Sequence, residues 1–392
     1  MKRSTFVFST LLVLMALPPG DARGNEWSNR GGMLNPGGGW FDWVQNTVDG
    51  RHCALGYGGS LQCYDPGTNT LETVYVNASQ TPDPQNGDLQ IFGWDHVNQE
   101  YLAMDGGRTI GPNPMAFSMI TRTWRILTNA DFDGIEARTK SGGAGSATSP
   151  DHDLFVVFAG SHTGYPGRKT LVLDFRNRTY REVNAPASMP ARNRTQGQLL
   201  YISSLRRFLL FGGVSSDYKI LNDLWLFDPV TMAWTSVTAQ DPPSGRYFSQ
   251  MAYDSINDLV YLYGGHGAVD GSVSVLHIGT WAWEHIPEPP GTVLVDYPGI
   301  RRVGAAIFDP GAGFCSGSGV LAGTDWVRSA QIWCWTHAFG DPPDPPEPPP
   351  PGWVLTISTP DRVRFEFLQE PPTGAVVYDC IGDATVIDCQ KR

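Results

Sequence analysis

The sequence is poor in charge and in the patterns that build helices. Only 17% of its 392 residues are charged, and 28 lysines and arginines face 39 aspartates and glutamates, so no general basic surface for nucleic acid is expected. No segment shows sustained helical periodicity, and no apolar run beyond the first residues could span a bilayer. Nucleophile-elbow, Walker and His-Glu-x-x-His motifs are also missing. We therefore expect no cofactor, no metal site and no membrane-spanning segment.

Glycine and proline, by contrast, are abundant. The chain has 45 glycines and 31 prolines, which favours a turn-rich β protein over a helical one. Proline concentrates in "GDPPDPPEPPPPGW" after Phe339, a segment typical of a semi-rigid spacer.

The first 22 residues read as a secretory signal peptide. Lys2 and Arg3 precede a short apolar core, and "GDA" provides a cleavage site that ends at Ala22. The apolar run is too short for a membrane span. This pattern predicts export, to the outside of the cell or to a periplasm.

Six cysteines follow, and an even number in an exported chain suggests disulfides. Sequence alone allows fifteen pairings of six cysteines. The spacing favours three local pairs across Gly-containing turns, and these are Cys53–Cys63, Cys315–Cys334 and Cys380–Cys389.

A repeat of about 50 residues organises the centre of the chain. Apolar runs end in pairs of small residues at Gly58-Gly59, Gly106-Gly107, Ala159-Gly160, Gly212-Gly213 and Gly264-Gly265, with a poorer copy ending at Gly323. An aromatic residue follows most of them, namely Trp124, Tyr180, Trp234 and Trp283. Such self-similarity indicates a propeller, in which each repeat is one blade.

These residues resemble kelch repeats, with "GG", a strand such as "DLWLFDP" and a following Trp. The resemblance covers roughly residues 40 to 340 and implies an all-β fold, a six-bladed β-propeller. We expect the propeller to occupy residues 23–340, a proline-rich linker residues 341–351, and a small β segment residues 352–392. Since the last blade lacks an outer strand before the linker, "NEWSN" is expected to fill that edge, with Trp27 in the repeat's aromatic position.

Four arginines occupy equivalent places before the first strand of a blade, namely Arg138, Arg194, Arg246 and Arg302. If they form a ring, they could bind an anionic ligand together with Arg168, because guanidinium groups form paired bonds to carboxylates. The alternative is structural: each arginine bonds to neighbouring loops.

Catalysis is a second possibility. His162 and Tyr165 lie in the Gly-rich loop of the third repeat, and His266 lies at nearly the same place in the fifth. A His with a Tyr could transfer protons in a polysaccharide lyase or a sugar-acid epimerase. Exposed His and Tyr side chains in loops are nevertheless ordinary.

Aromatic side chains are a third option. Trp40, Phe41, Trp43 and Trp94 could stack on sugar rings, or be packed within the sheets. The interpretation we favour is an exported propeller that binds a glycan or an extracellular protein. An enzyme on acidic sugars and a structural or adhesive surface protein remain the alternatives. The sequence indicates neither the ligand nor the oligomeric state.

Overall fold

The computed structural model describes an all-β chain. No helix among the described residues is long and apolar enough to cross a membrane, and the short helices present are the 3₁₀ turns η2 (Ile135–Ala137) and η3 (Pro150–His152). The chain divides into two compact units, Met1–His337 and Ala338–Arg392. The structure describes residues 25–32, 43–55, 60–75, 91–104, 114–137, 145–159, 169–189, 194–215, 217–267, 271–287, 301–302, 305–321, 328–337, 353–358, 362–367, 378–382 and 387–391.

The first three blades are four-stranded antiparallel meanders. Blade one comprises β2 (Trp43–Gln45), β3 (His52–Leu55), β4 (Leu61–Asp65) and β5 (Thr70–Tyr75). Blade two comprises β6 (Ile91–Asp95), β7 (Glu100–Met104), β8 (Met115–Ser118) and β9 (Thr123–Ile126). Blade three comprises β10 (Gly145–Ser149), β11 (Leu154–Ala159), β12 (Lys169–Asp174) and β13 (Thr179–Asn184).

The remaining blades follow the same order, with additions at the fifth and sixth. Blade four comprises β14 (Gln198–Ile202), β15 (Arg207–Val214), β16 (Ile220–Asp228) and β17 (Ala233–Val237). Blade five comprises β19 (Gln250–Asp254), β20 (Leu259–Tyr263), β22 (Val273–His277) and β23 (Ala282–Ile286). The short strands β18 (Arg246–Tyr247), before this blade, and β21 (His266–Gly267), after β20, pair in a separate two-stranded ribbon. Blade six comprises β25 (Ala305–Asp309), β26 (Gly313–Leu321), β27 (Arg328–Thr336) and β1 (Glu26–Gly32), and β24 (Arg301–Arg302) also pairs with β26.

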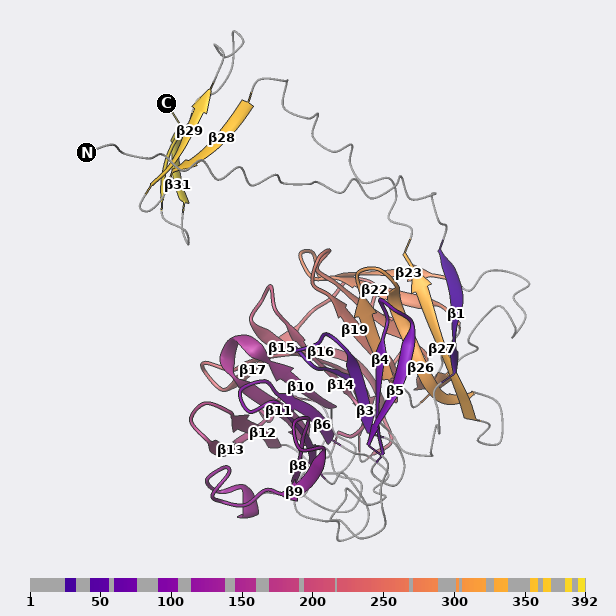
Figure 1. Ribbon diagram of the computed structural model, residues 1–392. Helices are drawn as coiled ribbons and strands as arrows, with labels where there is room; N and C mark the ends of the chain where they lie inside the picture. The colour runs from indigo at the N-terminus through magenta and orange to yellow at the C-terminus, as the bar shows by residue number, and fades with distance from the viewer. Residues whose placement is uncertain are drawn as a thin grey trace. The chain divides into compact units, whose positions relative to one another are not determined.

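The innermost strands of the six blades form a closed ring. Each of β2, β6, β10, β14, β19 and β25 contacts the next, and β25 returns to β2. Strands β6, β10, β14 and β19 of this ring are labelled in Figure 1. This arrangement confirms the six-bladed propeller. Because the strands of a blade alternate in direction, the connections after its first and third strands share one face, the turn face. The connections after its second and fourth strands share the opposite face, the loop face.

The N-terminal strand closes the propeller, as predicted. β1 pairs antiparallel with β27 at the outer edge of blade six, with Trp27 opposite Trp335. A segment from the start of the propeller sequence therefore completes the blade made by its end, which removes an open sheet edge.

The repeated glycine pair is required by close backbone approach. Gly212 and Gly213 have φ of 63° and 98°, and a Cβ built on each would lie 2.6 Å from the Arg246 carbonyl oxygen and 2.7 Å from that of Thr195. No side chain fits in these places, so glycine is required near the end of the second strand of blade four.

The repeat aromatics pack between neighbouring blades. Trp234 of blade four lies 5.2 Å from Phe158 of blade three, and Trp283 of blade five lies 5.5 Å from Phe211 of blade four, measured between ring centroids. Each large ring thus buries its area against the preceding blade, where it stabilises the packing of one sheet on the next.

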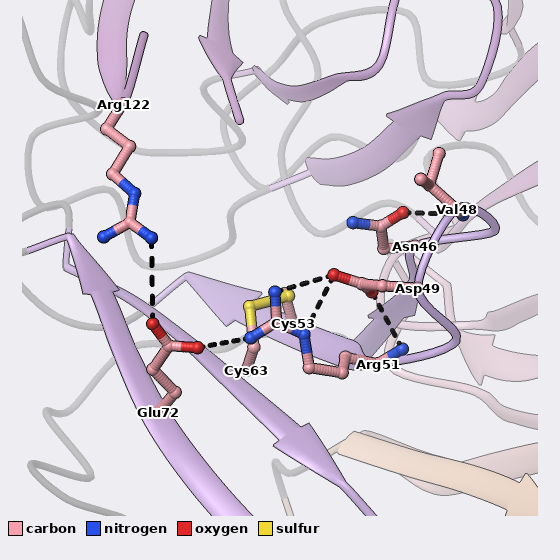
Figure 2. Close-up of a disulfide and its surroundings, with 8 residues drawn as sticks. All are labelled: Asn46, Val48, Asp49, Arg51, Cys53, Cys63, Glu72 and Arg122. Atoms are coloured by element: carbon pink, nitrogen blue, oxygen red, sulfur yellow. Dashed lines mark hydrogen bonds and ion pairs between the residues drawn. A yellow bond between two sulfur atoms is a disulfide. The ribbon is translucent and has the colours of Figure 1, made fainter. Parts of the chain in front are cut away.

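Two disulfides each cross-link the second and third strands of one blade, the first in blade one and the second in blade six. Cys53–Cys63 joins β3 to β4, and Cys315–Cys334 joins β26 to β27, each with Cα atoms 3.9 Å apart. Figure 2 shows the first beside Arg51, whose guanidinium bonds Asp49 at 2.6 Å and also pairs with Glu72. These are two of the three pairs expected from the spacing.

The C-terminal unit contains two hairpins. One pairs β28 (Trp353–Ser358) with β29 (Arg362–Phe367), and the other pairs β30 (Tyr378–Gly382) with β31 (Ile387–Lys391). Cys380 and Cys389 stand opposite each other in the backbone register of the second hairpin. That placement is compatible with the third expected pair, which stays a prediction.

Candidate functional site

An axial cavity lies where the innermost strands meet. Its volume is about 260 Å³, and every one of the six inner strands contributes to its lining. Strand β14 contributes most, through Gln198 to Tyr201, and β10 contributes Ser146 to Thr148. Trp43 on β2 and Trp94 on β6, two of the aromatics considered for sugar stacking, also border it, but they are only 7% and 1% exposed.

The cavity has a neutral polar lining. Among the described residues that line it, none is Asp, Glu, His, Lys or Arg. The polar groups are the side chains of Gln45, Thr47, Ser146, Thr148, Gln198 and Tyr201. Burial raises the pKa of Tyr201 to about 12, and its hydroxyl donates to Asp151 at 2.8 Å. The lining therefore offers hydrogen bonds, but no group that titrates near neutral pH.

The structure places Arg194 and Arg246 inside the protein. Their exposed fractions are 1% and 2%, and each guanidinium donates to a glycine carbonyl, of Gly212 and Gly264 respectively, at 3.3 Å. Arg194 also forms an ion pair with Asp223, which accepts a second bond from Trp225 Nε1 at 2.7 Å. This geometry matches the structural alternative, in which these arginines hold neighbouring loops.

The other proposed anion ligands are not brought together in the described part of the chain. Arg138 and Arg168 lie outside the described residues, and Arg302 is described only as part of the two-residue strand β24. Arg302 nevertheless pairs in register with Val320, so its backbone is at the loop end of blade six, as the repeat expects.

Of the catalytic candidates, only His266 is described. His162 and Tyr165 lie outside the described residues. His266, on β21, is exposed, and its ring stacks on Tyr247 with centroids 4.7 Å apart. Tyr247 in turn contacts Phe248 at 5.1 Å. The result is an aromatic cluster at the loop face of blade five.

A neighbouring feature on the loop face was not predicted from the sequence. The connection between β15 and β16 presents Tyr218, which is 88% exposed. Its flanking residues Asp217 and Lys219 form an ion pair at 3.2 Å, and Ile220 at the start of β16 is 40% exposed. The signal was a lone aromatic in the polar loop that follows the glycine pair of blade four.

The described residues contain no cluster of three or more His, Cys, Asp or Glu side chains that could hold a metal ion. The carboxylates instead cap turns: Asp95 Oδ1 accepts from the backbone of Val97 and Asn98, and Asp254 repeats the arrangement in blade five.

Comparison with known proteins agrees with this architecture. The profile of the KLHDC2/KLHL20/DRC7 Kelch-repeats domain matches residues 97–296, half of the chain. Acyl-CoA-binding domain-containing protein 5 of Arabidopsis thaliana is 29% identical over 237 residues, which are 55% of this chain and 34% of that protein. Kelch domain-containing protein 10 of Xenopus tropicalis is 28% identical over 200 residues, which are 47% of this chain and 46% of that protein. The match thus covers about a third of the length of the first relative and about half of the length of the second. The repeats, the six-bladed ring and the matching domain together show that the chain belongs to the kelch-repeat family.

Proposed function

We propose that this chain is an exported propeller that recognises a protein surface through its loop face, with Tyr218 as the anchor. The observation that carries the proposal is the exposure of this aromatic side chain, 88%, at the tip of the β15–β16 connection. Tyrosine is enriched among the few residues that dominate interface energies, since it supplies a large contact area with few rotatable bonds.

The tip that carries Tyr218 is internally hydrogen-bonded. The backbone N–H of Tyr218 donates to the Ser215 carbonyl at 2.9 Å, and Ser215 N–H donates to the Lys219 carbonyl at 2.9 Å. The Ser215 hydroxyl also accepts from Lys219 N–H at 3.1 Å. A loop held in this way loses little conformational entropy on binding, which favours its use as a contact surface.

The surroundings of Tyr218 favour a protein over an acidic glycan. Ile220 adds apolar surface, while Asp217 and Lys219 place both signs of charge beside the ring. An acidic glycan would favour an excess of positive charge, which these neighbours do not supply. Arg194 and Arg246, which could have supplied it, are buried.

Binding is favoured over catalysis by the chemistry of the cavity. An acidic-sugar lyase or epimerase needs a positioned base and a counter-charge for the carboxylate. The described lining of the axial cavity offers neither. Export is supported by the signal peptide expected at residues 1–22 and by two disulfides, which persist in oxidising compartments.

A pull-down with matched variants tests the proposal. The purified full chain, Tyr218→Ala and Val230→Ala would each be immobilised and exposed to extracellular proteins of the source organism, and the bound proteins quantified. Val230 is 77% exposed on the turn face, so it controls for loss of any exposed apolar side chain. We expect a partner that wild type and Val230→Ala retain and that Tyr218→Ala loses at least tenfold.

Two outcomes would contradict the proposal. One is specific binding to acidic glycans on an array, equal for wild type and Tyr218→Ala, with no protein partner that depends on Tyr218. The other is formation of an unsaturated uronate from a polysaccharide, detected by its ultraviolet absorbance, which would favour the lyase.

A further inference from the structure

The polar groups of the axial cavity are only partly used by the protein. The Thr47 hydroxyl accepts from Trp94 Nε1 at 3.0 Å, and the Thr148 hydroxyl accepts from Trp94 N–H at 3.4 Å. Each therefore keeps an O–H to donate. The Ser146 hydroxyl donates to the Phe92 carbonyl at 3.3 Å and keeps its ability to accept.

Gln198 adds a complete amide to this set. Its side chain lines the cavity from β14 and has no hydrogen-bond partner among the described residues. An amide supplies two donor hydrogens and an accepting oxygen. The lining thus combines spare donors and spare acceptors, a combination that hydroxyl groups satisfy because each can donate and accept.

The absence of charge from the described lining selects against ionic ligands. Burying an ionised group without a partner costs far more than burying a neutral hydrogen-bonding group. A phosphate or carboxylate would meet no cation among the described lining residues, and an amine would meet no carboxylate. The half-buried side chains of Ala147 and Leu200 offer apolar surface for C–H groups.

The size of the cavity limits the ligand further. Ligand pockets for drug-sized molecules span about 300–1,000 Å³, and this cavity, at about 260 Å³, is smaller. We propose that the axial cavity binds one neutral polyhydroxylated molecule of monosaccharide size, such as an aldohexose or a cyclitol. This site is separate from the protein-binding face, because Tyr218 does not line it.

Titration of the full chain with matched probes tests the site. The probes are D-glucose, D-galactose, myo-inositol and, as the charged counterpart of glucose, D-glucuronate. Isothermal titration calorimetry gives affinity and stoichiometry. We expect one-to-one binding of at least one neutral probe and at least tenfold weaker binding of glucuronate.

Variants locate the binding. Gln198→Leu should weaken binding of the neutral probe about tenfold, and Thr148→Val about threefold, as expected for one or two lost hydrogen bonds. Gln240→Leu makes the same change as Gln198→Leu at an exposed site outside the cavity and should have no effect. Tyr218→Ala should also leave the affinity unchanged, which separates this site from the protein-binding proposal. Melting temperatures of all variants show that they fold.

The proposal is overturned if no neutral probe gives saturable binding to the folded wild-type chain. It is also overturned if glucuronate binds as tightly as glucose, or if Gln240→Leu weakens binding as much as Gln198→Leu and Thr148→Val do.

Discussion

Trp27 of β1 packs on Tyr263 of β20, with ring centroids 4.9 Å apart. Trp27 belongs to the strand that completes blade six and Tyr263 to blade five, so the contact packs the closing strand against the preceding blade. Trp27 also lies 6.2 Å from Phe314 on β26. It therefore holds the position between blades that Trp234 and Trp283 hold in their own repeats.

Loss of the Trp27 side chain should destabilise the propeller. Removing a large core aromatic costs about 3–5 kcal/mol, and Trp27 is only half-buried, so we expect about 2–3 kcal/mol for Trp27→Ala. That corresponds to a fall of several degrees in melting temperature. Deletion of residues 24–30 should lower it at least as much, because it also removes the outer strand of blade six. Calorimetry checks both, with Tyr218→Ala as an exposed aromatic control. An unchanged melting temperature for the deletion would mean that another segment fills the edge.

The cysteine pairing is tested by peptide mapping. We expect a non-reducing digest of the purified chain to contain Cys53–Cys63, Cys315–Cys334 and Cys380–Cys389 as intramolecular pairs, because each pair stands directly opposite across two strands. Reduction should destabilise the propeller by a few kcal/mol at most, since each closed loop is short. Any cross-pair between the three sets in the folded protein would refute this assignment.

Arg194 distinguishes the structural interpretation from the anion-binding one. Its removal leaves the Gly212 carbonyl without this donor and Asp223 without its cation, so Arg194→Ala should cost about 3–5 kcal/mol of stability. The double variant Arg194→Met with Asp223→Leu removes both charges and should be less destabilised than Arg194→Ala. Urea denaturation measures both. A variant Arg194→Ala that keeps wild-type stability and loses affinity for an acidic glycan would support the arginine ring instead.

The fold could be predicted from the sequence because it leaves repeated marks. A glycine pair is needed wherever a second strand ends against a carbonyl, as at Gly212 and Gly213, and a large aromatic is needed wherever two sheets meet. Glycine pairs and following aromatics recur in most repeats of the sequence, with a period of about 50 residues. Closure by β1 was predicted for the same reason, because Trp27 completes the series.

The site left no such periodic mark. The cavity is lined by one inner strand from each blade, and equivalent positions carry different residues, such as Ser146 and Leu199. Tyr218 belongs to a single loop, and an exposed side chain is under no packing constraint that sequence could reveal. Arg194 and Arg246 were conspicuous in the sequence because each lies 18 residues before a glycine. In the structure each guanidinium donates to the carbonyl of that glycine, so the repeated spacing corresponds to a repeated internal hydrogen bond.

His52 should make stability depend on pH. Its side chain lies buried on β3, and burial lowers its pKa from 6.5 to about 4, although Asp309 and Asp65 act in the opposite direction. Between these two values the unfolded chain binds a proton that the folded chain excludes. Protonation therefore favours unfolding, and stability is lost as the pH falls from about 6.5 towards 4.

The contribution is measurable by urea unfolding at neutral pH and near pH 4.5. A shift of this size corresponds to about 2–3 kcal/mol lost on acidification. His52→Gln keeps hydrogen-bonding groups but cannot titrate. On acidification its free energy of unfolding should therefore fall by about 2–3 kcal/mol less than that of wild type. His277→Gln, a change at a surface histidine, should retain the wild-type fall. If wild type and His52→Gln lose the same stability over this interval, the acid sensitivity arises elsewhere, and His52 is not held neutral in the folded propeller.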